Sequence, residues 1–526
     1  WEHVGLEKSR TISAIRIHPQ NPDLVYVAAQ GSQWTDSEDR GVYRSVDGGK
    51  VWEKVLYTDE KTGPADLSMD ATNPRILYAA MWDHRRDPWL IRSGGEGSGI
   101  HKSTDGGETW SKINSGLPEV MGKVSVAVSP ANGDLLYANI EAEGEKGGVY
   151  RSDNGGKKWQ QVSKDRNTIT RAWYYIKIYA DPQDSETVYV LNFQVLKSID
   201  GGLTFNTLPI GNVDQHHLWI NPSNAANMIV ANDGGSAVTF NGGLSWSTQN
   251  NQPTAQFYRV IADDQFPYRI YGGQQDNSTV SIVSKTIYGG ISESDWYSVA
   301  GGESAFLAFS DPKDPDLTYG TSIQGFINMQ DKATGMAKDI MAYPSMNLGT
   351  FSNNLKYRFN WNGPLIHNQV NPKILYHGAN LLLRSDNGGH SWTEISPDLT
   401  RNDSSKHNEG GLPFTHENAG GEVYNTISYI AASPTQEKEI WVGSDDGLVH
   451  VTRDEGATWN EVSPAIEGEA LINAIEVSPH QEGAAFLAVN RHKFDDHRPM
   501  IFYTEDYGAN WKEIIEGLPD NHFVRV

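Results

Sequence analysis

The sequence predicts an all-β fold, a β-propeller made of four-stranded antiparallel blades. Three observations predict it: an eight-residue motif that recurs along the chain, a strand–turn–strand segment that recurs with it, and the composition. The 526 residues include 52 Gly, 23 Tyr and 16 Trp, which is typical of many short strands joined by tight turns.

The recurring motif has Ser or Thr first, Asp or Asn two residues later, Gly four residues later, and Trp or Phe seven residues later. An Asp or Asn side chain accepts backbone N–H groups and closes a turn, and Gly supplies a positive φ. The aromatic ring then starts the next strand and is expected to wedge between neighbouring sheets. Three copies carry Asn (Asn154, Asn241 and Asn387), which indicates a turn former rather than a catalyst. The eight copies begin at Ser45, Ser103, Ser152, Ser198, Thr239, Ser385, Thr452 and Thr504.

The second recurring segment is an apolar strand, a turn with Pro or Asp, and another strand. Its spacing of mostly about 40–60 residues is the period of a four-stranded blade. The blades that turn at Asp263 and Pro312 lack the motif. Ten such turns lie near Pro19, Asp70, Pro130, Pro182, Pro222, Asp263, Pro312, Pro372, Pro434 and Pro479.

Two arrangements of these ten blades stay open. We prefer two tandem propellers of the seven-bladed type, each present in part, in residues 1–250 and 251–526, because NNQPTAQF interrupts the repeat after the fifth motif. The alternative is a single ring of about ten blades. Trp1–Val4 and Phe523–Val526 each look like one blade strand, so we expect a longer repeat array or unusually closed ends.

Charge and composition exclude several classes of protein. The net charge is −23 and no basic run could neutralise phosphates, so nucleic acid is not an expected partner. The chain has no Cys, which excludes disulfides and zinc–cysteine sites. No run of about 18 apolar residues predicts a membrane span, and any targeting segment would lie upstream of Trp1.

No cofactor or metal is predicted. The sequence has no calcium-binding loop, Gly-rich phosphate loop or Gly-x-Ser-x-Gly elbow. His216 and His217 could bind a metal with Asp214 or Asp233, but adjacent residues of a strand point to opposite faces.

The motif copies resemble the Asp-box (BNR) repeats of bacterial sialidases, of two-propeller xyloglucanases and of ten-bladed sortilin-type receptors. The whole chain resembles a family of bacterial glycosyl-hydrolase-like or sortilin-like repeat proteins, in segments such as RAWYYIKIYADP and YRFNWNGP. This resemblance implies a propeller in an extracellular, cell-surface or periplasmic setting. The catalytic residues of the enzymes do not transfer: Arg-Ile-Pro is missing, and around Asp39 the Asp-Ile-Gly-Gly core of xyloglucanases is replaced.

The candidate site residues lie in the long connections between the second and third strands of blades and between blades. These connections are expected on the face opposite the motif turns, and variable loops on a rigid scaffold usually carry recognition. Trp82 and Trp89 could instead pack a loop, and Arg85 and Arg86 could pair with local acids. The candidate ligand-binding residues are Trp34, Trp82, Arg85, Arg86, Trp89, Arg171, Trp173, Tyr174, His216, Gln275, Arg358, Trp361, His416 and Arg491.

Three functions follow as hypotheses. The first is a secreted or surface-attached protein that binds a glycan or an extended peptide, since aromatic rings beside polar groups suit both ligands. The second is a glycoside hydrolase that uses a carboxyl pair. The third is a structural component of an assembly with other surface proteins. The candidate catalytic carboxyls are Asp233, Asp276, Glu303 and Glu417.

Overall fold

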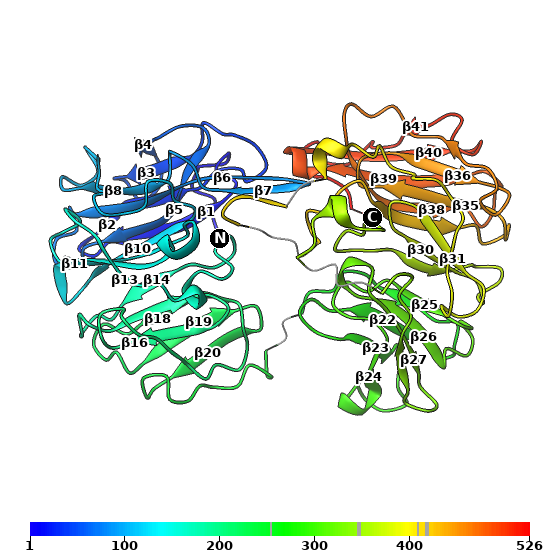
Figure 1. The fold of residues 1–526 in the computed structure, drawn as a ribbon, viewed down its shortest axis with the longest axis horizontal. Helices are drawn as coiled ribbons and strands as arrows, with labels where there is room; N and C mark the ends of the chain where they lie inside the picture. The colour runs from blue at the N-terminus through cyan, green and yellow to red at the C-terminus, as the bar shows by residue number, and fades with distance from the viewer. Residues whose placement is uncertain (253–254, 345–348, 408–409, 416–419, 526) are drawn as a thin grey trace. The chain divides into compact units, whose positions relative to one another are not determined.

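The computed structural model describes all residues except 253–254, 345–348, 408–409, 416–419 and 526. Over the described residues the chain forms ten β-sheets joined by turns, loops and a few 3-10 helices of three residues each (Figure 1). The predicted all-β fold with four-stranded antiparallel blades is therefore confirmed. No described helix has the length and apolar character needed to cross a bilayer.

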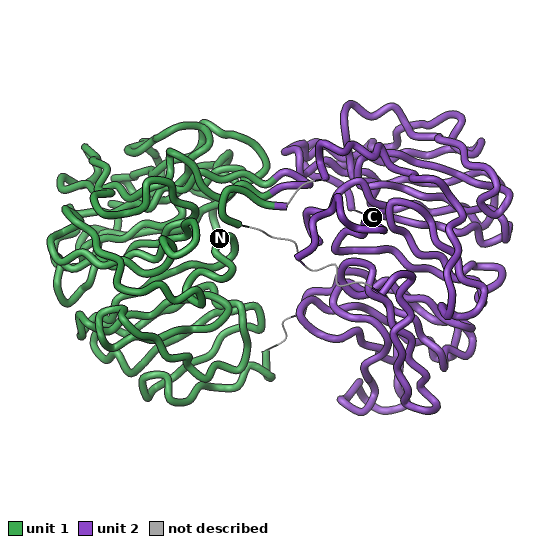
Figure 2. Tube along the Cα trace, in the orientation of Figure 1, with its two compact units in different colours: residues 1–86, 91–254, 411–415 green, residues 87–90, 255–410, 416–526 purple. Residues whose placement is uncertain are grey.

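The chain divides into two compact units (Figure 2). Unit 1 comprises residues 1–86, 91–254 and 411–415, and unit 2 comprises residues 87–90, 255–410 and 416–526. Each unit contains five of the ten sheets. The domain boundaries expected from the sequence, 1–250 and 251–526, stay a prediction.

Three sheets of unit 1 have four strands in sequence order, and the last has three. They are β1 (Ile12–His18), β2 (Asn21–Ala29), β3 (Gly41–Ser45) and β4 (Glu53–Leu56); β10 (Val124–Ser129), β11 (Asn132–Ile140), β12 (Gly148–Ser152) and β13 (Gln160–Ser163); β14 (Ile178–Ala180), β15 (Val188–Leu191), β16 (Val195–Ser198) and β17 (Asn206–Thr207); and β18 (Gln215–Ile220), β19 (Met228–Asn232) and β20 (Gly235–Thr239).

The second sheet of unit 1 is larger because two strands extend it. The hairpin strand β7 lengthens the sheet, and β33 pairs with β7 in parallel although it comes from far along the chain. The strands are β5 (Thr62–Met69), β6 (Leu77–Asp87), β7 (Leu90–Ser93), β8 (Gly99–Ser103), β9 (Ser111–Lys112) and β33 (Gly411–Pro413).

The five sheets of unit 2 each have four strands in sequence order. They are β21 (Ile261–Ala262), β22 (Arg269–Gly273), β23 (Thr279–Val283) and β24 (Trp296–Val299); β25 (Leu307–Phe309), β26 (Leu317–Thr321), β27 (Ile327–Asp331) and β28 (Ala337–Asp339); β29 (Leu365–His367), β30 (Leu375–Gly378), β31 (Leu382–Ser385) and β32 (Thr393–Glu394); β34 (Ile427–Ala432), β35 (Ile440–Ser444), β36 (Val449–Thr452) and β37 (Asn460–Glu461); and β38 (Leu471–Val477), β39 (Ala485–Arg491), β40 (Asp496–Thr504) and β41 (Lys512–Glu513). The first two of these sheets form although they lack the motif, as expected.

Consecutive sheets pack through their first strands. In unit 1, β5 contacts β1 and β10, and β10 contacts β14; in unit 2, β29 contacts β25 and β34, and β34 contacts β38. The cores lie between the sheets. One of them joins Tyr78, Val126, Leu136 and Trp159, all buried. This face-to-face packing of neighbouring sheets is that of propeller blades.

The motif forms the turn before the last strand of a blade, as predicted. In the copy at Ser103, the Ser103 hydroxyl donates to Asp105 Oδ1 at 2.8 Å and accepts the N–H of Gly107 at 2.8 Å. Asp105 Oδ1 also accepts the N–H of Thr109 at 3.0 Å. The two motif glycines have φ values of 80° and 87°, a conformation that a Cβ disfavours.

The predicted wedge between sheets is also present, with one correction. The indole N–H of Trp159 donates to the carbonyl of Ile113, in the preceding sheet, at 2.8 Å, and that of Trp392 donates to Ile340 in the same way at 2.9 Å. The aromatic residue lies just before the last strand instead of starting it, because β13 begins at Gln160. After the motif at Thr239, no fourth strand of that sheet is formed among the described residues.

The hydrogen bonds agree with the expectation that the motif turns and the long connections lie on opposite faces. The N–H of Gly48 in a motif turn donates to the carbonyl of Asp23, near the start of β2 and beside the turn that follows β1, at 3.0 Å. The long loop after β2 instead bonds to the segment that leaves β4, through Ser37 N–H and Glu60 O at 2.8 Å. Trp1–Val4 and the described part of 523–526 are not strands, although Val4 O accepts the indole N–H of Trp52.

Candidate functional site

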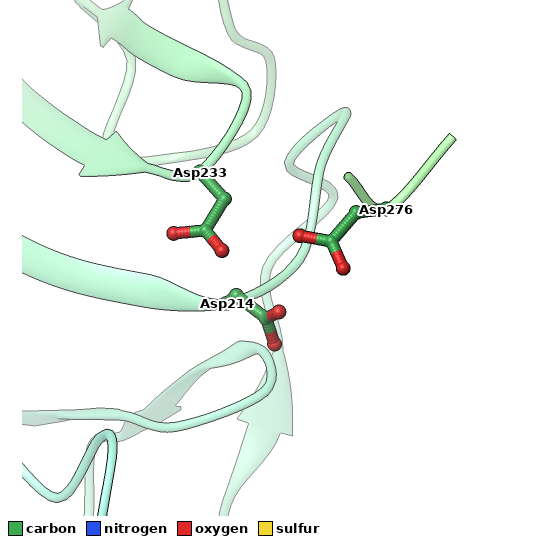
Figure 3. Close-up of side chains that lie close together, drawn as sticks. All are labelled: Asp214, Asp233 and Asp276. Carbon is green, nitrogen blue, oxygen red and sulfur yellow. The ribbon is translucent and has the colours of Figure 1, made fainter. Parts of the chain in front are cut away.

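The candidate site lies at one end of the β18–β19 pair in unit 1. Asp214 directly precedes β18 and Asp233 directly follows β19, and because Gln215 pairs with Asn232 the two carboxyl groups lie at the same end of the sheet (Figure 3). Each offers an oxygen within 4.8 Å of an oxygen of the other. Asp276, also labelled in Figure 3, belongs to unit 2 and is described with it.

Asp214 is held by its backbone and is buried. Its φ of 60° is in the left-handed region, and its N–H donates to Phe193 O at 2.9 Å. Its side chain is 4% exposed, and Oδ1 has no hydrogen-bond partner. Burial raises the pKa of this carboxyl, while a hydrogen bond from the Tyr175 hydroxyl opposes the rise.

Asp233 is more exposed and pairs with a histidine. Its Oδ1 lies 2.6 Å from Nε2 of His216, whose ring also contacts the edge of the Tyr175 ring at 5.2 Å. The His217 ring contacts the edge of the Tyr179 ring at 5.7 Å, and the pairing with β19 is irregular between Gln215 and His217. The two histidines contact different tyrosines, and the expectation that they face opposite ways stays a prediction.

Arg171 and two tyrosines complete the site. The Arg171 guanidinium lies 4.6 Å from the ring centre of Tyr174 and 5.6 Å from that of Tyr175, and it donates to the Tyr175 hydroxyl at 3.2 Å. Tyr174 is partly exposed, and Tyr175 is buried. The charge of Arg171 acts on Asp214, so the carboxyl pair lies near a cation that stacks on the partly exposed Tyr174.

Four of the residues predicted from the sequence meet here: Arg171, Tyr174, His216 and Asp233. The sequence did not predict Asp214 as the carboxyl partner of Asp233, and considered it only as a metal ligand. The signal was available, since an Asp before one strand and an Asp after its antiparallel neighbour reach the same sheet end.

Two predicted tryptophans of unit 1 lie in the interior. Trp82 is 2% exposed; its ring stacks on His84 at 4.3 Å and meets the edge of Trp173, also buried, at 4.9 Å. The Trp82 indole N–H donates to the Ser93 hydroxyl at 3.0 Å. Both rings are core residues rather than surface platforms.

The buried tryptophans are part of a polar cluster that fixes the β33 segment. Lys123 Nζ lies 4.8 Å from the Trp82 ring centre and donates to Trp173 O at 2.6 Å. Burial, followed by the charge of Lys177, lowers the pKa of Lys123 to about 7. Glu141 accepts hydrogen bonds from the hydroxyls of Ser93 and of Thr415, which follows β33, and burial raises its pKa.

The other predicted residues of unit 1 make local contacts. Arg85 lies 3.6 Å from the Asp36 carboxylate, and Arg86 lies 5.9 Å from the ring centre of Trp34. These contacts agree with the loop-packing alternative.

Two predicted carboxyls of unit 2 are neighbours. Asp276 has a φ of 56°, and its N–H donates to Glu303 Oε2 at 3.2 Å. The N–H of the preceding Gln275 donates to Gln256 O at 2.9 Å. Predicted His416 and Glu417 lie outside the described residues.

The remaining predicted residues of unit 2 are spread over its surface and interior. The Trp89 ring lies 5.4 Å from that of Tyr424. Arg358 pairs with Asp398 at 2.8 Å, and Arg491 pairs with Asp496 at 3.1 Å. Trp361 O accepts a hydrogen bond from the Ser304 hydroxyl at 3.1 Å.

Comparison with known proteins identifies the repeat. The BNR/Asp-box repeat model matches residues 101–112. Similar solved structures include a GH74 enzyme from Niastella koreensis, with 16% identity and a TM-score of 0.40 over 98% of this chain and 87% of that chain. They also include a GH74 xyloglucanase from Xanthomonas campestris, with 13% identity and a TM-score of 0.43 over 96% of this chain and 86% of that chain. No curated protein matches the sequence.

The repeat match and the observed sheets agree with the prediction made from the motif copies. The chain contains Asp-box repeats and is built of β-propeller blades.

Proposed function

We propose that unit 1 binds a glycan at the Asp214–Asp233 site. The observation that carries this proposal is the juxtaposition of the carboxyl pair with Arg171 and the partly exposed ring of Tyr174. Aromatic faces stack on the C–H faces of sugars, and carboxylates and guanidinium groups bond to sugar hydroxyls. Extended peptide is the alternative ligand, since the same groups anchor peptides.

Glycoside hydrolysis is the second candidate, and the carboxyl pair favours it. Retaining glycosidases use two carboxyls roughly 5 Å apart, with a proton donor of raised pKa. Asp214 would protonate the glycosidic oxygen as its bond to C1 breaks, and Asp233 would attack C1 to form a glycosyl ester. Water, deprotonated by Asp214, would then hydrolyse the ester and release the reducing sugar.

The test is a screen of polysaccharides and peptides for retention and for the release of reducing ends. We expect Tyr174→Ala to weaken retention by about tenfold or more, a loss of roughly 1.4 kcal/mol. Tyr57→Ala, which removes another exposed tyrosine of unit 1, is the matched control and should bind like the wild type.

Two further variants separate binding from hydrolysis. Asp214→Asn and Asp233→Asn should lower the release of reducing ends by about a hundredfold or more while retention persists, if the pair is catalytic. Retention without release in the wild type would leave a glycan-binding protein. Failure to retain any polysaccharide, or a Tyr174→Ala variant that binds normally, would contradict the proposal.

The extracellular, cell-surface or periplasmic setting and the contact with other surface proteins stay predictions. Cell fractionation with an antibody against the protein tests the first. Cross-linking on intact cells tests the second.

A further inference from the structure

Unit 2 contains a cavity of about 220 Å³ with a cationic lining. Four positively charged side chains line it, namely Arg259, Arg491, Lys493 and Arg525, against a single carboxyl group, that of Asp445. The whole chain has a net charge of −23, so a group of four cations around one cavity differs from the acidic character of the chain. All of the residues that line the cavity belong to unit 2.

Arg259 is the clearest unbalanced charge in this cavity. Its guanidinium lies 3.8 Å from the ring centre of Phe306, and its buried Nε has no hydrogen-bond partner. Among the residues that the structure describes, neither Arg259 nor Arg525 forms an ion pair. Burial, and to a smaller extent the charge of Arg525, lowers the pKa of Arg259 to about 10. Arg259 therefore stays charged at neutral pH, and a partly buried charge without an ion-pair partner is unfavourable.

The acid in the lining does not balance these cations. Asp445 is 8% exposed, and its carboxyl accepts the N–H and the hydroxyl of Thr426 at 2.9 and 2.7 Å. Burial, with the charge of the neighbouring Asp446, raises its pKa well above the usual range. Arg491, by contrast, already has a carboxylate partner outside the cavity, Asp496.

Neutral polar groups in the lining are also without partners. The Tyr424 side chain is 2% exposed, and its hydroxyl has no hydrogen-bond partner. Oδ1 of Asn362 is likewise buried without a partner. Phe494 and Phe523 supply an apolar wall. A buried hydroxyl and a buried amide oxygen without partners indicate groups that a ligand would satisfy.

We propose that this cavity binds a small ligand that carries an oxyanion, either a carboxylate or a phosphate. Arg259 and Arg525 supply the counter-charge, and Tyr424 and Asn362 bond to polar groups of the ligand. The volume equals that of about seven water molecules, which suits a single sugar acid or a molecule of similar size. This proposal is independent of the glycan site of unit 1.

The test is isothermal titration of the full chain with glucuronate, with inorganic phosphate, and with glucose as the neutral match for glucuronate. We expect glucuronate or phosphate to bind at least tenfold more tightly than glucose. Binding of one anion alone identifies whether the carboxylate or the phosphate is preferred. The proposal is wrong if neither anion binds more tightly than glucose.

Variants locate the binding. Arg259→Gln should weaken anion binding at least tenfold, while Arg453→Gln should not, since Arg453 is an exposed cation that lies beside Glu482 and does not line the cavity. Arg525→Gln should also weaken anion binding. Because this change leaves the contact between Arg259 and Phe306 intact, it tests the proposal even if Arg259→Gln does not fold. Wild-type affinity in a folded Arg259→Gln or Arg525→Gln variant would overturn the assignment.

Discussion

Units 1 and 2 share a scaffold and differ in the chemistry that it carries. Each unit has five sheets, and in both the Asp-box indole bonds to the sheet before it. Unit 1 gathers two carboxyls at the ends of β18 and β19, whereas unit 2 gathers cations around a cavity. The repeat thus determines the sheets, and the connections between strands determine charge and function.

The two units also differ in how a partly buried cation behaves. In unit 1, Lys123 donates to a backbone carbonyl and its pKa falls to about 7, so it loses its proton near neutrality. In unit 2, the pKa of Arg259 falls only to about 10, so its charge persists. A lysine in this environment can serve the structure as a neutral amine, while an arginine keeps a charge that only a ligand or solvent can balance.

The largest expected effect tests the shared scaffold. Trp159→Ala should lower the free energy of unfolding by about 3–5 kcal/mol, because it removes a large buried ring and leaves a cavity. Trp511 holds the same place in unit 2 and bonds to Val462 O at 2.6 Å, but it is only partly buried. Trp511→Ala should therefore lower the free energy of unfolding by less than Trp159→Ala does. Denaturant unfolding measures both, and a larger loss for Trp511→Ala would break the equivalence of the two units.

The sequence predicts the scaffold far better than the sites. The Asp-box acts locally: Ser103, Asp105 and Gly107 bond to one another within five residues, so the pattern alone predicts the turn. Sheet packing follows from the period of the copies. The pairing of Asp214 with Asp233 depends instead on strand register, and the burial of Trp82 on how a long loop folds inward. The cavity of unit 2 draws on residues spread over most of that unit, a placement that no local pattern encodes.

A smaller effect tests the partly buried Lys123 of unit 1. Below about pH 7, Lys123 is protonated in the folded and unfolded chains alike, and the cost of burying its charge is complete. Between pH 7 and its ordinary pKa of 10.5, the unfolded chain binds more protons, so stability rises with pH. We expect the free energy of unfolding to rise across that window and to level off above pH 10.5.

Lys123→Met keeps the packing against Trp82 and removes the titration. Denaturant unfolding at pH 6, 8 and 10 should show a flatter pH dependence for the variant than for the wild type. Lys338→Met, at an exposed position in unit 2, is the control and should follow the wild type. Parallel curves for Lys123→Met and the wild type would mean that Lys123 stays charged in unit 1, as Arg259 does in unit 2.

The smallest expected effect comes from exchanging Asp and Asn in the Asp-box between the units. Hydrogen bonds from Thr109 and Ser103 lower the pKa of Asp105 to about 2, so its contribution to stability is complete above pH 4 and is lost as the pH falls toward 2. Asp105→Asn should remove this acid dependence and change stability little at pH 7, since Asn387 closes the same turn in unit 2 through Ser391. Asn387→Asp should introduce the dependence there. Thermal melts between pH 2 and 7 measure both exchanges.

If each variant reverses the pH dependence of its own turn, the effect of the charge depends on the turn and not on the unit, because the same local hydrogen bonds form with either side chain. If Asp105→Asn instead destabilises unit 1 at every pH, the Asp105 carboxylate makes a stabilising interaction that the turn in unit 2 lacks.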